Sequence, residues 1–492
     1  MGTKTVSSNM KNTTDCRQSG IAWLLTVIGP GIVVAGSVMG SGELINTPVQ
    51  AAKFGFVLLW VVLLSCVIKY FLQVEIGRHA MVHGRTTHQA LNICPGPKYR
   101  GTSWIGIIYM GGYLVSCLTI PGMIGALAGM MHSEMPLDHW ISRIGGEPVH
   151  HLENQSIAWW GGILVLLSMV LLWKGVYRHL EVLIAILVGV FSISVAIALV
   201  AIQASEYRIT MNEVFSGLTF SFGDTPKLAA YAVISLMGAL GATANELFMY
   251  PYWILEKGYN RHLGDRGDAA WSQRVRLWVH AIRIDSGVAT GLATLMTGAF
   301  FLLGCAILHR QSRVPAGINV VETISQVYTE SFGPWSRYVF LVGAFATLFS
   351  TVLVATAASG RMFGDFLGSL GVINYRDLKM RSRVHRLTQF WLLLMVLGVF
   401  LWCGSAPVRL IVFSQFFSAV FSTPLLLFAI CWMAFHTDRK ARMSQLTAFF
   451  LVTTSLIIVA CVVVGLVIRY ATCLEAILEA MRLCYEAWLS AW

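Results

Sequence analysis

The chain has 492 residues, of which 56% are hydrophobic and only 12% are charged, and its mean hydropathy is +0.68. This composition excludes an ordinary soluble domain and is typical of a membrane protein with many spans. The net charge of +11 does not point to a nucleic-acid partner, because lysine and arginine gather in alternate connections between apolar runs.

Apolar runs of about 20 residues, the length that crosses a bilayer, recur along the chain. We expect eleven membrane spans, at about 21–50, 54–80, 103–132, 156–173, 178–203, 228–257, 283–308, 334–362, 386–404, 408–434 and 444–470. The basic connections predict a multi-pass protein of the cell (inner) membrane with a cytoplasmic N-terminus and an external C-terminus. The amphipathic tail 471–492 is expected to form a surface-lying helix rather than a twelfth span.

The spans form one membrane domain, with no soluble domain between them. After a polar N-terminal tail, residues 1–20, we expect a first repeat over 21–203 and a second over 228–434, followed by the span 444–470. Each repeat opens with an apolar segment interrupted by small residues, a pattern that inverted repeats leave in transporter sequences. The expected fold class is therefore an all-α integral membrane protein with a 5+5 inverted repeat and broken first and sixth spans.

No nucleophile–base pair and no cofactor motif is present in the sequence, so neither an enzymatic activity nor a resident cofactor is expected. The ten cysteines have no metal-ligand spacing and are interpreted as small buried apolar residues. The expected partners are the lipid bilayer and a small transported cation or solute. The sequence does not specify an oligomeric state, and a monomer is consistent with this interpretation.

Glu43 lies in the first interruption, in the run V-M-G-S-G-E-L-I-N-T-P over residues 38–48. A carboxylate inside a span is costly and is rarely placed there without a function. Gly40, Ser41 and Gly42 let the backbone leave helical geometry, which frees carbonyls for a cation and amides for an anion. Two compatible interpretations of Glu43 follow: contact with a substrate or ion, and capping of the second half-helix at its positive dipole end.

Asn245 and Glu246 lie in the second interruption, G-A-L-G-A-T-A-N-E-L-F-M-Y-P over residues 238–251. An amide oxygen and a carboxylate are hard ligands that suit Mg²⁺, Mn²⁺ or Ca²⁺. Together with Glu43 they form the predicted metal-ligand set. The alternative for Asn245 is an inter-helix hydrogen bond.

Lys69, in the run V-I-K-Y-F-L-Q-V-E, is a third charge inside a span. It is interpreted either as the salt-bridge partner of Glu43 or Glu246, which could separate when substrate arrives, or as a side chain that snorkels toward the cytoplasmic face. A salt bridge to one glutamate would weaken the case for a divalent cation.

Two further carboxylates are interpreted as structural. Asp285 lies near Arg283 at a span entrance and is expected at the membrane interface. Arg361 and Asp365 are four residues apart, the spacing of an ion pair on one helix face.

Several segments of the chain follow one another in a recognisable order. They are G-P-G-I-V-V-A-G-S-V-M-G-S-G-E-L at 29–44, F-G-F-V-L-L-W-V-V-L-L-S at 54–65, Y-R-H-L-E-V-L-I-A-I-L-V-G-V at 177–190, L-G-A-T at 240–243, and Ser414-Gln415 with Pro424. In this order they resemble the Nramp family of divalent-metal transporters over about residues 25–435. The resemblance implies the LeuT-type inverted-repeat fold and proton-coupled transport. It also implies that two positions match site residues of the family, namely Ala242, as a backbone-carbonyl ligand, and Gln415.

The departures from the family fall on the metal site. The family's Asp-Pro-Gly-Asn reads Gly40-Ser41-Gly42-Glu43 here, and its Met-Pro-His reads Asn245-Glu246-Leu247. Thr119 and Gly122 stand where the family has acidic residues for proton passage. Loss of the methionine removes the soft ligand that favours transition metals.

The leading interpretation is therefore a transporter of a hard, Mg²⁺-like or Mn²⁺-like cation. Its predicted site residues are Gly40, Ser41, Glu43, Ala242, Asn245, Glu246 and Gln415, with Lys69 as charge partner. The rival interpretation is a transporter of a small organic amine or amino acid, held by the Gly-Ser-Gly break and Glu246. In that case Glu43 would repel a substrate carboxylate unless it is protonated or paired with Lys69.

Overall fold

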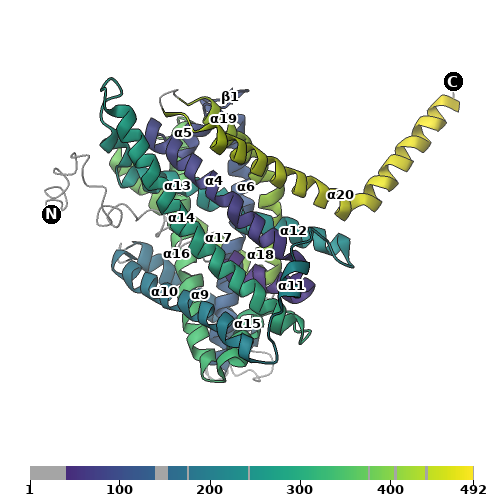
Figure 1. Cartoon of the computed structure of the whole chain (residues 1–492). Coiled ribbons are helices and arrows are strands. Elements are labelled where there is room, and N and C mark those ends of the chain that lie inside the picture. Colours follow the sequence, from purple (N-terminus) through teal and green to yellow (C-terminus); the bar gives the residue numbers. More distant parts are fainter. Residues whose placement is uncertain are drawn as a thin grey trace.

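The structure is a computed structural model that describes residues 40–138, 153–173, 177–241, 244–374, 377–403, 407–437 and 441–490. Within these residues the chain is almost entirely helical, and the helices stand together as one bundle (Figure 1). The strands of this part are one short antiparallel pair, in which Lys98 faces Ser103 and Tyr99 faces Thr102.

The elements up to the second predicted interruption are, in chain order, η1 (Gly42–Asn46), α3 (Thr47–Phe54), η2 (Gly55–Leu58), α4 (Leu59–His83), α5 (Thr87–Leu91), β1 (Lys98–Tyr99), β2 (Thr102–Ser103), α6 (Trp104–Ser116), α7 (Thr119–Glu134), α9 (Glu153–Trp173), α10 (Tyr177–Ala201), η4 (Ile202–Ala204), α11 (Met211–Ser216) and α12 (Pro226–Leu240). The elements after it are α13 (Ala244–Glu256), η5 (Tyr259–Leu263), α14 (Trp271–Leu303), η6 (Gly304–His309), η7 (Gly317–Asn319), α15 (Val320–Phe332), α16 (Ser336–Ser369), α17 (Leu378–Cys403), α18 (Pro407–Phe417), η8 (Ser418–Ser422), α19 (Thr423–Phe435) and α20 (Gln445–Ser490).

Nine helical segments in the described part of the chain are long and apolar enough to cross a membrane. They coincide with the second to fifth and the seventh to eleventh predicted spans. The sixth predicted span is divided into α12 and α13, and the first lies mostly in residues 1–39, outside the described part. The all-helical membrane fold predicted from sequence is thus confirmed, whereas the repeat boundaries at 21–203 and 228–434 stay predictions.

Local sequence explains several helix ends. Pro226 lies in the first turn of α12, where the missing amide costs no hydrogen bond. Pro48 lies in the first turn of α3, directly after the π-helical segment η1. Helix α4 ends at Gly84, whose φ of 63° lies in the left-handed region that glycine adopts without strain. Thr86 then caps α5 by accepting a hydrogen bond from the amide of Gln89, whose side chain bonds back in a capping box.

Long helices pack in pairs around the two interrupted ones. Helix α14 lies along α4, α12 along α20, α16 along α17, and α7 along α18. Helix α20 continues to Ser490, and its C-terminal part projects from the bundle in Figure 1. The predicted tail 471–492 is therefore helical as far as that residue, and its position on a membrane surface stays a prediction.

Candidate functional site

The first interruption is a change of helix type. Residues Gly42–Asn46 form the π-helical segment η1, which passes directly into α3 at Thr47. A π turn leaves backbone groups without their usual α-helical partners, and such turns recur at functional sites. Two further π-helical segments follow in the described part of the chain, η6 after α14 and η8 after α18. The second interruption separates Leu240, the last residue of α12, from Ala244, the first of α13.

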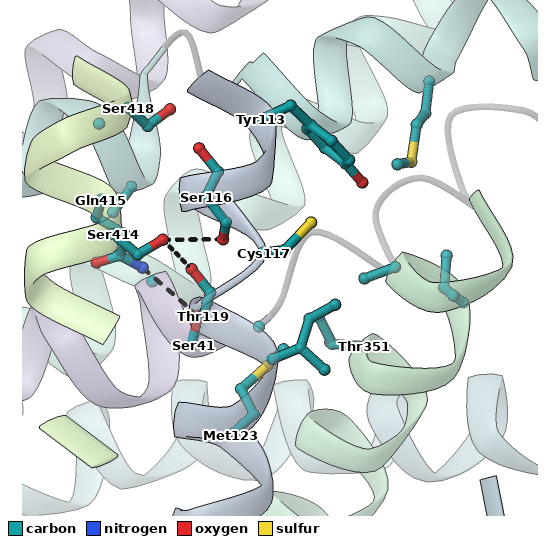
Figure 2. A pocket seen from close by; sticks show the side chains of 18 of the residues that line it. Ser41, Tyr113, Ser116, Cys117, Thr119, Met123, Thr351, Ser414, Gln415 and Ser418 are labelled. Atoms are coloured by element: carbon teal, nitrogen blue, oxygen red, sulfur yellow. Dashed lines mark hydrogen bonds between the residues drawn. The ribbon is translucent and has the colours of Figure 1, made fainter. Parts of the chain in front are cut away.

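A cavity of about 90 Å³ lies beside these segments. This is room for several water molecules. Figure 2 shows side chains of α6, α7, α18 and η8 converging on it. Its lining residues are Gly40, Ser41, Gly42, Glu43, Tyr113, Ser116, Cys117, Thr119, Ile120, Met123, Gly238, Ala239, Met249, Trp253, Thr351, Val354, Ala355, Ser414, Gln415 and Ser418.

Glu43 has the capping position that one interpretation predicted, and it also lines the cavity. Its Oε2 accepts a hydrogen bond of 3.0 Å from the backbone N–H of Gly40, and the side chain is 4% exposed. Ser41 lies between them and its hydroxyl faces Gln415 (Figure 2). The carboxylate thus caps the start of the helix, and the same residue lines the cavity.

A chain of side-chain amides holds Gln415 in place. The Nε2 of Gln50 donates to the Oδ1 of Asn46 at 2.8 Å, and the Nδ2 of Asn46 donates to the Oε1 of Gln415 at 2.6 Å. Asn46 Nδ2 also donates to the hydroxyl of Ser235 on α12. Because an amide donates only through nitrogen, this direction leaves Gln415 Nε2 to face the hydroxyl of Ser41, 3.5 Å away. The oxygen of Gln415 is engaged by Asn46.

Hydroxyl groups line the part of the cavity wall that adjoins Gln415 and Ser41 (Figure 2). Ser414 donates to the carbonyl of Ser116 at 2.9 Å, and its oxygen lies 2.6 Å from that of Thr119 (Figure 2). Ser418 follows one turn later, in η8. This part of the wall is therefore neutral and rich in oxygen.

Lys69 is 3% exposed, so its ammonium does not snorkel to the surface at the end of α4. Cys66, one turn earlier, lies within electrostatic range of both Lys69 and Glu43. The predicted role of Lys69 as charge partner is compatible with this placement.

The second-break ligands fall largely outside the described part of the chain. Ala242 lies outside it, and the side chains of Asn245 and Glu246 lie outside it as well. Their backbone opens α13, whose later turns bring Met249 and Trp253 to the cavity.

Several lining residues were missed by sequence reasoning. Tyr113, Cys117, Met123, Met249 and Thr351 were not singled out, although all line the cavity. Helical spacing offered a signal for Met249, because it is four residues from Trp253, another lining residue, on the helix that follows the second break. The other four come from α6, α7, the connection between them and α16, far away in the sequence.

One structural interpretation is wrong, and a second stays a prediction. Asp285 is 0% exposed and lies fourteen residues into α14, and its expected position at the membrane interface stays a prediction. Arg361 pairs with Glu256 at 3.0 Å and lies over the ring of Trp253. Asp365 instead accepts hydrogen bonds from Thr86 and Tyr252. Sequence spacing on one helix could not reveal partners on α5 and α13.

Within the described residues, no group of three or more histidine, cysteine, aspartate or glutamate side chains could hold a metal ion. A cation at the cavity would therefore rely on Glu43 together with hydroxyl, carbonyl and water oxygens, and on whatever the second break contributes. This donor set is hard in character, although the sulfur atoms of Met123, Met249 and Cys117 also lie on the cavity wall.

Comparison with known proteins gives a consistent picture. The family model described as Nramp, natural resistance-associated macrophage protein-like, matches residues 31–471. The chain is 24% identical over 432 residues to the divalent metal cation transporter MntH of Bradyrhizobium diazoefficiens, covering 86% of this chain and 84% of that protein. It is 24% identical over 450 residues to MntH of Brucella suis biovar 1, covering 90% and 87%.

Solved structures share the fold at low sequence identity. A mutant of the manganese transporter of Eremococcus coleocola has a TM-score of 0.62 and 18% identity, covering 92% of this chain and 89% of that one. MhsT in complex with L-phenylalanine has a TM-score of 0.55 and 13% identity, covering 90% and 98%. These likenesses confirm the LeuT-type transporter fold and nothing finer.

Proposed function

The chain belongs to the Nramp family of membrane transporters, and from that premise we propose that it moves a hard divalent cation, Mg²⁺-like or Mn²⁺-like, by proton-coupled symport. The observation that carries this proposal is the oxygen-rich cavity at the first helix break. Glu43 supplies a negative charge there, and Ser41, Ser116, Thr119 and Ser414 supply hydroxyl or carbonyl oxygens.

The size of the cavity favours a cation that keeps part of its water shell. Mg²⁺ dehydrates reluctantly and is held by one or two carboxylates plus waters rather than by a closed protein cage. A space of about 90 Å³ takes the ion and a few waters, whose outer hydrogen atoms can bond to the hydroxyl wall. The relatives named MntH are divalent metal cation transporters, which supports the same class of substrate.

Glu43 and Glu246 would bind the cation directly, with Asn245 as a neutral oxygen ligand and the carbonyl of Ala242 as a fourth. Gly40 and Ser41 would shape the break, and Gln415 would contact the hydrated ion through its Nε2 side. Lys69 would neutralise a glutamate while the site is empty. The protein would span the cell (inner) membrane several times, with the N-terminus in the cytoplasm and the C-terminus outside.

The test is isothermal titration calorimetry of the purified protein with Mg²⁺, Mn²⁺ and Ca²⁺, combined with uptake into proteoliposomes. We expect saturable binding that Glu43→Gln and Glu246→Gln each remove. The matched control is Glu256→Gln, on the same helix as Glu246 but paired with Arg361 and half exposed. Binding that survives both Glu43→Gln and Glu246→Gln would overturn the proposal.

The second candidate is a small amine or amino acid. Neutral donors and acceptors around the cavity, among them Gln415 Nε2 and the hydroxyl of Ser418, favour a polar organic solute. Against an amino acid, the N–H of Gly40 that would receive its carboxylate already donates to Glu43. Absence of binding by all three cations, with saturable binding of an amine in the same calorimeter, would favour this candidate.

A further inference from the structure

Asp285 is a carboxylate buried in the middle of the bundle, away from the cavity. It lies fourteen residues into α14, which begins at Trp271, or about 21 Å along the helix at 1.5 Å per residue. It is 0% exposed. Its Oδ2 accepts a hydrogen bond of 2.9 Å from the hydroxyl of Tyr250, which also lies 3.3 Å from the hydroxyl of Ser286. An ionisable group at this depth is expensive unless it serves a function.

Helix α4 covers this region of α14, and two contacts fix how the helices lie against each other. Cys66 is hydrogen-bonded to Thr294, and a Cβ placed on Gly287 would lie 3.7 Å from the ring of Tyr70. Residue numbers therefore rise along α4 while they fall along α14. This antiparallel register brings Lys69 to about the level of Thr290.

The same register brings Gln73 to about the level of Ser286. We call the four residues Lys69, Gln73, Ser286 and Thr290 the α4–α14 seam. All four are buried, with exposed fractions between 0% and 7%. The seam therefore joins the level of Lys69 to the level of Asp285.

Two polar atoms of the seam are buried without a hydrogen-bond partner among the described residues. They are the Nε2 of Gln73 and the Oγ1 of Thr290. A buried polar group in this situation is normally bonded to an internal water. Waters bonded to these two atoms would lie between α4 and α14, one at about the level of Lys69 and the other at about the level of Ser286, which is next to Asp285 in sequence.

On its other side Asp285 is linked toward the end of the bundle at η5. Tyr259 lies within electrostatic range of Asp285 and packs on Trp278, which stacks on the half-exposed ring of His262. Charged or titratable groups on the elements around Asp285 are Lys69, Glu75 and Arg78 of α4, Tyr250 of α13, Tyr259 and His262 of η5, and Arg283 of α14.

We propose that Asp285 is a proton-binding group of the transport cycle, reached from the η5 end and connected to Lys69 by a hydrated α4–α14 seam. A hydronium ion at the η5 end gives up a proton, which forms an O–H bond with a carboxylate oxygen of Asp285 and leaves a water molecule; the charge of Asp285 changes from −1 to 0. The loss of that charge removes the electrostatic attraction between Asp285 and the ammonium of Lys69, since charges interact strongly where bulk water is excluded. The cavity beside Glu43 is thereby linked to proton uptake.

This assignment rests on the proposed function and gives it a proton site. The family positions for proton passage hold Thr119 and Gly122, which bind no proton. Asp285 supplies a carboxylate, and the seam supplies a lysine, an amide and hydroxyl groups. These residues lie on α4 and α14, which are among the most closely packed pairs of the bundle.

The test uses pH-difference infrared spectra of the full chain, recorded without any cargo between about pH 5 and about pH 9, the range to which burial can move a carboxyl group. We expect a protonated-carboxyl band that Asp285→Asn removes and that Tyr250→Phe shifts in frequency. The matched control is Asp365→Asn, which removes an equally buried carboxylate bonded to Thr86 and Tyr252 on other elements.

A band that persists in Asp285→Asn, or that Asp365→Asn removes instead, would overturn the assignment. A second measurement follows internal pH in proteoliposomes during cation uptake, where Asp285→Asn should keep cation binding and lose the proton movement that accompanies uptake. Unchanged proton movement in this variant would also overturn it. If the wild type binds no cation, the proposed function fails, and the infrared result still decides the protonation of Asp285.

Discussion

Gly238 of α12 and Gln415 of α18 approach so closely that a Cβ on the glycine would lie 2.0 Å from the backbone oxygen of Gln415. No side-chain carbon fits at that distance. The last turn of α12, just before the second break, is therefore pressed against the backbone that carries a predicted site residue. Small residues allow this approach between membrane helices, and here the approach sets the position of Gln415 in the cavity.

Gly238→Ala should therefore push α12 away from α18. Overpacking of a closely packed contact typically costs about 1–3 kcal/mol, and the displaced Gln415 should weaken substrate binding as well. Thermal unfolding in detergent and calorimetric titration measure the two effects. Gly398→Ala is the control, because nothing lies within 4 Å of a Cβ on this α17 glycine. A Gly238→Ala protein with wild-type stability and affinity would contradict this account.

The sequence predicted the spans well because their signal is local. A run of about 20 apolar residues has few structural options in a bilayer, so ten of the eleven predicted spans have helices at the expected places. The break at Gly40–Glu43 was also visible, since glycine, a carboxylate and proline interrupt one apolar run. Its exact form, a π-helical segment closed by Glu43, follows from hydrogen bonds that no sequence pattern specifies.

The site was predicted less completely because its walls come from distant helices. Tyr113, Cys117 and Thr351 have ordinary membrane-helix contexts, and only the packing of α6, α7 and α16 around the break brings them to the cavity. The burial of Asp285 was also not visible in the sequence, where Arg283 lies close to it. The long helix α14 begins well before that point, at Trp271, and Asp285 is fully buried within the protein.

The two roles of Glu43 can be separated by substitution. Glutamine keeps an oxygen that can accept from the N–H of Gly40 but removes the charge, whereas alanine removes both. We expect Glu43→Gln to unfold near the wild-type temperature and to lose cation binding. Glu43→Ala should also lose about 0.5–2 kcal/mol of stability, the usual cost of a missing helix cap. Equal stability of the two variants in thermal unfolding would exclude the capping contribution.

Asn46 should affect the site although it does not line the cavity. Its amide connects Gln50, Ser235 and Gln415, so Asn46→Leu leaves buried polar groups unpaired, at about 1–3 kcal/mol. It should also release Gln415 and change substrate affinity. A double-mutant cycle with Gln415→Leu measures the coupling, expected at about 0.5–3 kcal/mol. Additive effects on affinity would mean that Asn46 acts on stability alone.

The buried ring of His88 leads to a prediction of how the stability of the folded protein depends on pH. It lies in α5, outside the membrane spans, with its ring against Phe248 and Phe366 and both nitrogens unpartnered among the described residues. Burial lowers the pKa of His88 to about 3, from an ordinary value of 6.5. Between these two values the unfolded chain binds the proton and the folded chain does not. The folded state therefore has its full stability above about pH 6.5 and loses stability as the pH falls below that value.

The loss should amount to about 2 kcal/mol between about pH 7 and about pH 5, at about 1.4 kcal/mol for each pH unit well below the unfolded value. His88→Phe keeps an aromatic ring in this pocket and has no proton to bind, so it should flatten the stability curve over that interval without loss at neutral pH. The measurement is chemical or thermal unfolding across the pH range, with His436→Phe, at an exposed position, as the control. If His88→Phe and the wild type lose equal stability toward acid, the acid sensitivity arises from other groups.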